Sequence, residues 1–165
     1  MSMRGPGWAS RALDSERQVR EAAGWVARFA DWNLWIGLTY RDWVPDARCA
    51  TDLRRWLQYI PRNLVRTHVP AFWVVGPQRR GVQHFHVMLA APKPIAAGVR
   101  TGLYSTWLRT NPLAGSTHIR GVGEAVRAAS YGLERHANWD IGILCPRSAA
   151  RCRRRNPCVE GPPPW

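Results

Sequence analysis

The sequence predicts an α+β fold, a central antiparallel sheet of about five strands with flanking helices. Short runs of β-forming residues alternate with stretches of helical periodicity, in the order helix, strand, helix, hairpin, helix, strand, helix, strand. Two of these strands flank a short segment rich in Gly and Pro, residues 76–81, which predicts a hairpin and therefore antiparallel pairing. No internal repeat is visible, and 165 residues suffice for one core.

The first half of the chain is expected to form two helices and a strand. Residues 14–30 carry apolar side chains at helical spacing, and Ser15 and Gln18 have the spacing of a capping box. Residues 35–40, WIGLTY, are apolar and rich in β-formers, which predicts a strand buried on both faces. The segment from Leu53 to Leu64 is a second amphipathic pattern, with a kink expected at Pro61.

The second half begins with the hairpin strands, predicted at residues 71–75 and 82–90. After them we expect a helix at 95–109, a turn at 111–112, a strand at 117–122, a helix at 123–136 and a strand at 139–144. Residues 1–145 then form one domain with its core at 34–144. Residues 146–165 are rich in Arg and Pro and are expected to form a basic tail.

The charge of the chain predicts a polyanionic partner, with 24 Lys and Arg against 11 Asp and Glu. Residues 53–123 contain ten Arg or Lys and no Asp or Glu, whereas exposed surfaces normally mix both signs. We expect this stretch to lie along a nucleic-acid backbone. The arginines expected to contact it are Arg54, Arg55, Arg79, Arg80, Arg120 and Arg127.

The compartment is predicted from segments that the sequence lacks. The first ten residues have no apolar run of the signal-peptide kind, and no apolar segment of 18 residues occurs. The expectation is a cytoplasmic protein without membrane contact.

His84 and His86 in the segment QHFHVML are the first candidate metal ligands. Alternate side chains of a strand share a face, so both imidazoles should point the same way while Phe85 points into the core. Two imidazoles on one face can bind a single cation.

Two more motifs flank this pair, the strand WIGLTY upstream and Tyr131 with Arg135 downstream. In this order the three resemble the motifs of HUH endonucleases, specifically the single-tyrosine initiators (Rep) of rolling-circle plasmids and phages. The resemblance spans about residues 35–144 and implies a ferredoxin/RRM-like fold. It also implies that His84 and His86 hold Mn²⁺ or Mg²⁺ and that Tyr131 is the nucleophile, with Arg135 as its basic partner one turn later.

The resemblance implies metal-dependent, sequence-specific nicking and joining of single-stranded DNA through a 5′-phosphotyrosine, which initiates rolling-circle replication. The substrate would be an origin or stem-loop, and a separate host- or element-encoded helicase would open the duplex. A phenol with its ordinary pKa of about 10 is a poor nucleophile and needs positive charge nearby. Arg127 and Arg135 lie four residues before and after Tyr131, on its side of the helix.

The third metal ligand is left open by the sequence. Related initiators often carry a Glu on the strand before the two histidines, and the matching position here is Gly76. Glu134 on the tyrosine helix is the first choice and Gln78 in the hairpin loop is the second. Asp31 and Asp42 are further alternatives.

Other interpretations are kept beside this one. A zinc site is one, although its spacings are looser than those of zinc ribbons; its ligands would be His136, Cys145, Cys152 and Cys158. The alternative function is a non-catalytic single-stranded nucleic-acid-binding protein of ferredoxin-like fold. A relaxase or transposase would use the same chemistry, but a transposase of this superfamily tends to have Gln where Arg135 stands.

Overall fold

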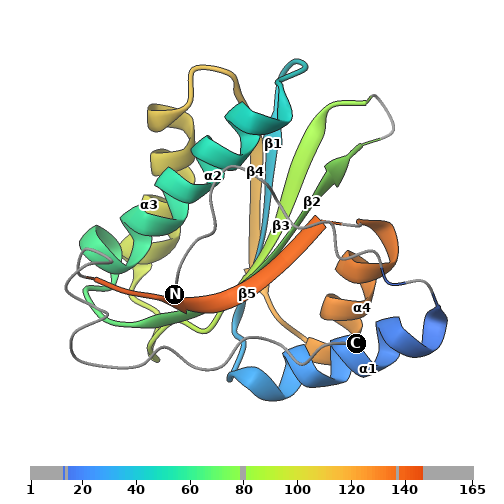
Figure 1. Ribbon diagram of the computed structural model, residues 1–165. Coiled ribbons are helices and arrows are strands. Elements are labelled where there is room, and N and C mark those ends of the chain that lie inside the picture. Colours follow the sequence, from blue (N-terminus) through green and yellow to red (C-terminus); the bar gives the residue numbers. More distant parts are fainter. Residues whose placement is uncertain (1–12, 14, 79–80, 137, 147–165) are drawn as a thin grey trace.

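The structure, a computed structural model, describes residues 13, 15–78, 81–136 and 138–146. They form one five-stranded antiparallel sheet in the order β4-β1-β3-β2-β5 (Figure 1). The strands are β1 (Leu34–Tyr40), β2 (Val69–Pro77), β3 (Gln83–Leu89), β4 (Ala114–Gly121) and β5 (Asn138–Leu144). The predicted α+β class and antiparallel sheet are confirmed. The expected basic tail lies outside the described residues from residue 147 onward.

Helices cover both faces of this sheet (Figure 1). On one face lie α2 (Asp46–Tyr59), the π-helical turn η1 (Ile60–Leu64) and α3 (Ala97–Thr110); on the other lie α1 (Glu16–Phe29) and α4 (Ala125–Arg135). The segment from β1 to β4 has the connections and strand order of a ferredoxin-like unit, as expected. The α4 helix and β5 extend this unit beyond β2.

Strand β1 has apolar side chains on both faces because it lies inside the sheet between β3 and β4. Leu34, Ile36 and Leu38 are fully buried in the core under α2 and α3. Trp35 points the other way, into the core under α1 and α4. The predicted strand is confirmed and one of its faces is buried throughout, whereas on the other face Trp35 is buried and Gly37 and Thr39 are half-buried.

Two elements begin three or more residues earlier than the sequence pattern predicted. Helix α2 starts at Asp46, directly after Pro45, because Cys49 and Ala50 pack into the core before the apolar stripe begins at Leu53. Strand β4 starts at Ala114 rather than at residue 117. The neighbouring Gly115 allows this because a Cβ there would lie only 2.8 Å from the backbone of Tyr40.

The expected kink at Pro61 takes the form of the π-helical turn η1. Proline has no amide hydrogen, so the regular ladder of α2 stops at Tyr59. The amide of Val65 then donates to the carbonyl of Ile60 across five residues, at 3.1 Å.

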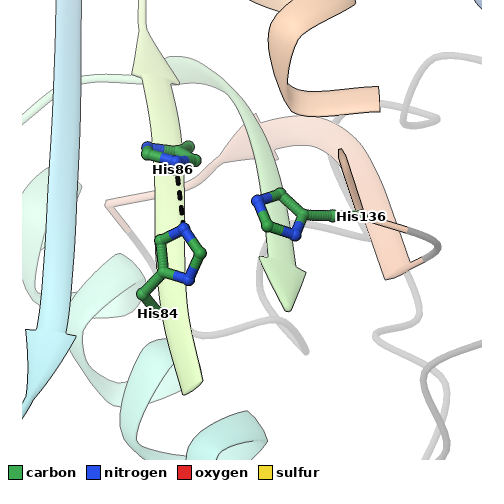
Figure 2. Close-up of side chains that lie close together, drawn as sticks. All are labelled: His84, His86 and His136. Atoms are coloured by element: carbon green, nitrogen blue, oxygen red, sulfur yellow. Dashed lines mark hydrogen bonds between the residues drawn. The ribbon is translucent and has the colours of Figure 1, made fainter. Parts of the chain in front are cut away.

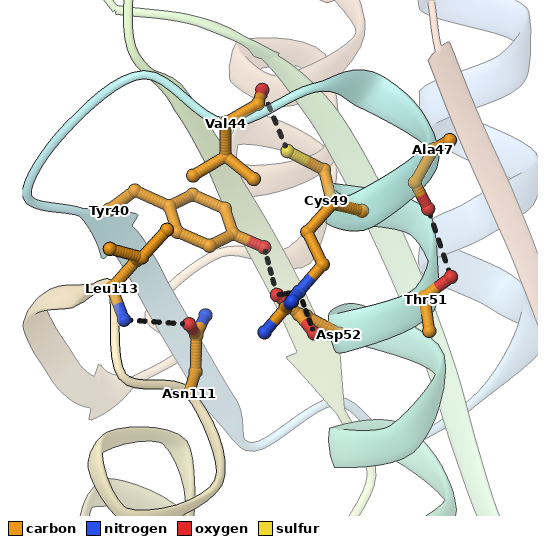
Figure 3. Close-up of polar contacts among 9 residues, drawn as sticks. Tyr40, Val44, Ala47, Cys49, Thr51, Asp52, Asn111 and Leu113 are labelled. Atoms are coloured by element: carbon orange, nitrogen blue, oxygen red, sulfur yellow. Dashed lines mark hydrogen bonds and ion pairs between the residues drawn. The ribbon is translucent and has the colours of Figure 1, made fainter.

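A buried polar cluster joins the end of β1 to α2 (Figure 3). The Tyr40 hydroxyl donates to Oδ2 of Asp52 at 3.2 Å, and Nε of Arg48 donates to both oxygens of that carboxylate at 2.8 and 2.9 Å. Asp52 is 4% exposed, so these bonds supply partners that water cannot. Burial raises the pKa of the Cys49 thiol to about 11 and that of Tyr40 above its ordinary value. At neutral pH the Tyr40 phenol and the Cys49 thiol are therefore uncharged, so neither group repels the carboxylate of Asp52.

Replacement of Trp107 by Ala should destabilise the fold by about 3–5 kcal/mol, because it leaves a cavity in the hydrophobic core under α2 and α3. Trp107 is fully buried, and its Nε1 donates to the carbonyl of Thr39 at 3.1 Å. Urea unfolding followed by far-UV circular dichroism gives the free energy of unfolding. Trp43→Ala is the control because Trp43 is 65% exposed, and we expect a change within about 0.5 kcal/mol. Equal losses in the two variants would contradict this account of the core.

Candidate metal centre and nucleophile

His84 and His86 lie side by side on the face of β3 that α1 and α4 partly cover (Figure 2). Phe85, between them, is fully buried in the opposite core, so the predicted alternation is confirmed. The Nε2 atoms of the two histidines are 3.2 Å apart. Two imidazole nitrogens that each lie about 2.1 Å from one cation are about 3.0–3.4 Å apart at octahedral or tetrahedral angles, so the spacing fits a shared metal ion.

The third member of the group is His136, directly after the last residue of α4. Ring nitrogens of His84, His86 and His136 all lie within 4.8 Å of one another (Figure 2). His136 is 5% exposed, and neither of its ring nitrogens has a hydrogen-bond partner among the described residues. Buried polar atoms normally have partners, so this donor set fits a bound cation.

The structure brings His136 to the pair, and not Glu134, Asp31 or Asp42. Glu134 is exposed and is not part of the histidine group, and neither are Asp31 and Asp42. Gln78 lies in the hairpin loop, where its backbone amide donates to the carbonyl of Val82, and a role for its side chain as a ligand stays a prediction. The chain turns inward immediately after α4, so His136 beyond the helix reaches the pair while Glu134 stays exposed.

Of the cysteines expected to form a zinc site with His136, the one that the structure describes does not lie in the histidine group. Cys145 lies just beyond β5, with its Sγ 3.9 Å from the carbonyl of Ile143, and is not in the histidine group. Cys152 and Cys158 lie outside the described residues.

Gly76 provides both the space and the orientation for this group. It pairs with His84 across the β2–β3 ladder. A Cβ at this position would collide with Nδ1 of His136. The Gly76 carbonyl is 2.8 Å from Nδ1 of His84; because a carbonyl can only accept, Nδ1 carries the proton. The Nε2 lone pair of a neutral His84 therefore points at the centre of the group.

The three imidazoles are held neutral. Burial lowers the pKa of His86 to about 3 and that of His136 to about 4, and it also lowers the pKa of His84. Repulsion from the neighbouring histidines, and from Arg120 and Arg135, contributes further at His86. Neutral imidazole is the form that binds a metal ion, so the site is ready to bind at pH 7.

Tyr131 lies beside the histidines, as the order of the motifs predicted. Its ring centroid is 5.5 Å from that of His86 and 6.3 Å from that of Trp35, which itself stacks on His86. The Arg135 guanidinium lies 4.6 Å from the centre of the Tyr131 ring. Tyr131 is 41% exposed, so a substrate can reach it.

The predicted nucleic-acid contacts do not form one surface. Arg120 lies beside the histidines, with its guanidinium 5.9 Å from the centre of the Trp35 ring, and Arg127 is exposed on α4. Arg54 and Arg55 belong to α2, on the opposite face of the sheet. Arg79 and Arg80 lie outside the described residues. The acid-free stretch therefore contributes to both faces of the molecule, and it does not line one continuous path.

No family model, curated protein or solved structure matches this chain. In the part of the chain that the structure describes, no helix is long and apolar enough to span a bilayer. Function is therefore argued from the site itself.

The metal-free protein should lose stability as the pH falls from about 6.5 towards 4. In this range unfolded histidines bind protons, whereas His86 and His136 stay neutral in the fold, so the unfolded state is favoured. Above pH 6.5 both states are neutral and this contribution disappears. Urea unfolding in EDTA at a series of pH values gives the slope of the free energy of unfolding against pH, which should be smaller for His86→Gln than for the wild type. His68→Gln, at an exposed position, should keep the wild-type slope. An unchanged slope in His86→Gln would show that His86 is not held neutral in the fold.

Gly76→Ala should weaken binding of Mn²⁺ or Zn²⁺ at least about tenfold, because the added methyl group displaces His136. Isothermal titration calorimetry measures the affinity. Gly98→Ala is the matched control, since nothing lies within 4 Å of a Cβ there. His136→Gln tests the same ligand without adding bulk near Gly76 and should weaken binding similarly. Wild-type affinity in both variants would exclude His136 as a ligand.

Proposed function

We propose that this protein nicks and rejoins single-stranded DNA through a covalent 5′-phosphotyrosine at Tyr131, with a divalent cation held by His84, His86 and His136. The observation that carries this proposal is the position of Tyr131. An exposed phenol lies at the edge of a group of three neutral histidines, 5.5 Å from the His86 ring, beneath the Arg135 guanidinium.

The donor set supports a transition-metal ion. When bound, the cation would offset the negative charge of the non-bridging phosphate oxygens, which lowers the barrier to attack. Mg²⁺ prefers oxygen ligands, whereas imidazoles suit later transition metals. Of the two cations expected from the sequence, Mn²⁺ is therefore favoured over Mg²⁺.

The protein's own residues supply the nucleophile and its activation. Arg135 beside the ring adds positive charge next to the attacking oxygen, and the hydroxyl proton of Tyr131 passes to solvent as it attacks. The phenolic oxygen forms a bond to phosphorus while the bond from phosphorus to the 3′ oxygen breaks, and that oxygen takes up a proton. Arg120, over Trp35 on the neighbouring strand, adds positive charge where the phosphate would lie. Reversal of the same steps rejoins the strand.

Initiation of rolling-circle replication in the cytoplasm is the biological role we propose for this reaction, at an origin or stem-loop that a separate helicase opens. The formal net charge of +13 supports a nucleic-acid substrate. A relaxase would use the same chemistry. A non-catalytic binding protein would have no use for one buried and two half-buried neutral histidines beside an exposed tyrosine.

Tyr131→Phe should abolish formation of a covalent protein–DNA adduct while leaving metal affinity unchanged. The protein is incubated with Mn²⁺ and a labelled pool of random-sequence single strands, and adducts are detected on denaturing gels. Tyr104→Phe is the matched control because Tyr104 is also exposed, on α3 across the sheet, and it should form the wild-type amount. Adduct formation by Tyr131→Phe would disprove the nucleophile, and its absence from the wild type would disprove the reaction.

A further inference from the structure

A second basic surface lies where α2 and α3 meet, on the far side of the sheet from the histidines. Arg55, Tyr59 and Arg62 follow one another at spacings of four and three residues, so they share one side of α2 and its continuation η1. From α3, the Arg109 guanidinium donates to the Tyr59 hydroxyl at 3.2 Å. We call these four residues the arginine seam.

The charge of the seam is not neutralised by the protein. Arg55, Arg62 and Arg109 are exposed, and none forms an ion pair with an acidic residue of the described chain. The sequence offers no such residue from Leu53 to Gly123. Asp52, the nearest acid before them, is buried and paired with Arg48 at 2.8 Å. Three guanidiniums therefore share one surface without a counter-charge, which favours a polyanion.

The sheet separates this seam from the proposed nicking site (Figure 1). Helices α2 and α3 pack on the core of one face, whereas Tyr131 and the histidines belong to the other. A helix layer packs about 10 Å from a sheet. A strand bound at Tyr131 therefore cannot contact the seam through the body of the protein.

We propose that the arginine seam binds the sugar–phosphate backbone of duplex DNA. Guanidinium groups bind phosphates in bidentate fashion, and a duplex presents one charge per about 1.7 Å of its axis, twice the density of one of its strands. Sites for single strands add aromatic side chains on which bases stack. Tyr59 is half-buried and its hydroxyl accepts from Arg109, so it offers no such platform.

The exposed tyrosine of α3 does not change this conclusion. Tyr104 precedes Arg109 by five residues, which places the two side chains about 140° apart around the helix. The seam thus offers positive charge without a platform for base stacking, and contacts to phosphates do not distinguish one base sequence from another. It binds whether or not Tyr131 is a nucleophile.

The test compares two triple variants that remove the same charge. Arg55, Arg62 and Arg109 are replaced by Gln in one, and Arg17, Arg20 and Arg28, exposed on α1, are replaced by Gln in the other. Fluorescence anisotropy with the full chain in EDTA measures binding to a labelled duplex of about 20 base pairs and to one of its strands, at about 50–200 mM salt. EDTA removes any contribution from metal-bound phosphate.

The seam variant should bind duplex at least about tenfold more weakly, and the slope of log affinity against log salt should fall by about 2 to 3. The α1 variant should lose less than about threefold. Replacement of the three seam arginines by Lys should keep the slope, which would show that the Gln variant has lost charge rather than structure. Equal losses in both Gln variants, an unchanged affinity, or a loss for the single strand as large as that for the duplex would each overturn the proposal.

Discussion

In the β2–β3 ladder Gly76 faces His84, and the candidate site depends on this one pairing. The Gly76 carbonyl fixes the proton of His84 on Nδ1, and the missing side chain leaves room for His136. Antiparallel pairing sets which residue faces which, so a slip of one residue would turn both β3 histidines into the opposite core. Phe85, fully buried under the other helix layer, opposes such a slip. The hydrophobic pattern of β3 thus determines the position of the histidines.

The electrostatics of the site follow from burial and from the absence of acids. Three neutral imidazoles leave a divalent cation with its full charge, whereas a carboxylate ligand would reduce it. Arg120 and Arg135 lie close enough to lower the pKa of His86 and add to the positive potential. These arginines repel a cation and attract a phosphate. In the proposed reaction the anionic substrate therefore completes the site, and we expect binding of cation and phosphate to be cooperative.

The sequence predicted what depends on local periodicity. Alternation along β3 placed His84 and His86 on one face, and helical spacing placed Arg135 beside Tyr131; both are confirmed. His136 was missed as their partner because its approach depends on how α4 ends and β5 returns to the sheet, which no local pattern encodes. The one sequence signal was a glycine at position 76. The sequence also predicted that the acid-free residues 53–123 form one surface, and this was wrong. The helices and strands of this stretch lie in different layers, so its arginines are divided between the two faces of the sheet.

Strand β1 connects the two surfaces. Trp35 stacks on His86 on the site face, whereas Tyr40 bonds to Asp52 of α2 and the Thr39 carbonyl accepts from Trp107 of α3. Because one central strand contacts both layers, the arginine seam and Tyr131 are held at a fixed separation. If the seam holds duplex DNA, a strand leaving that duplex must pass around an edge of the sheet to reach Tyr131. The β4 edge offers this route, since α3 packs beside β4 and Arg120 of the same strand is exposed next to the histidines.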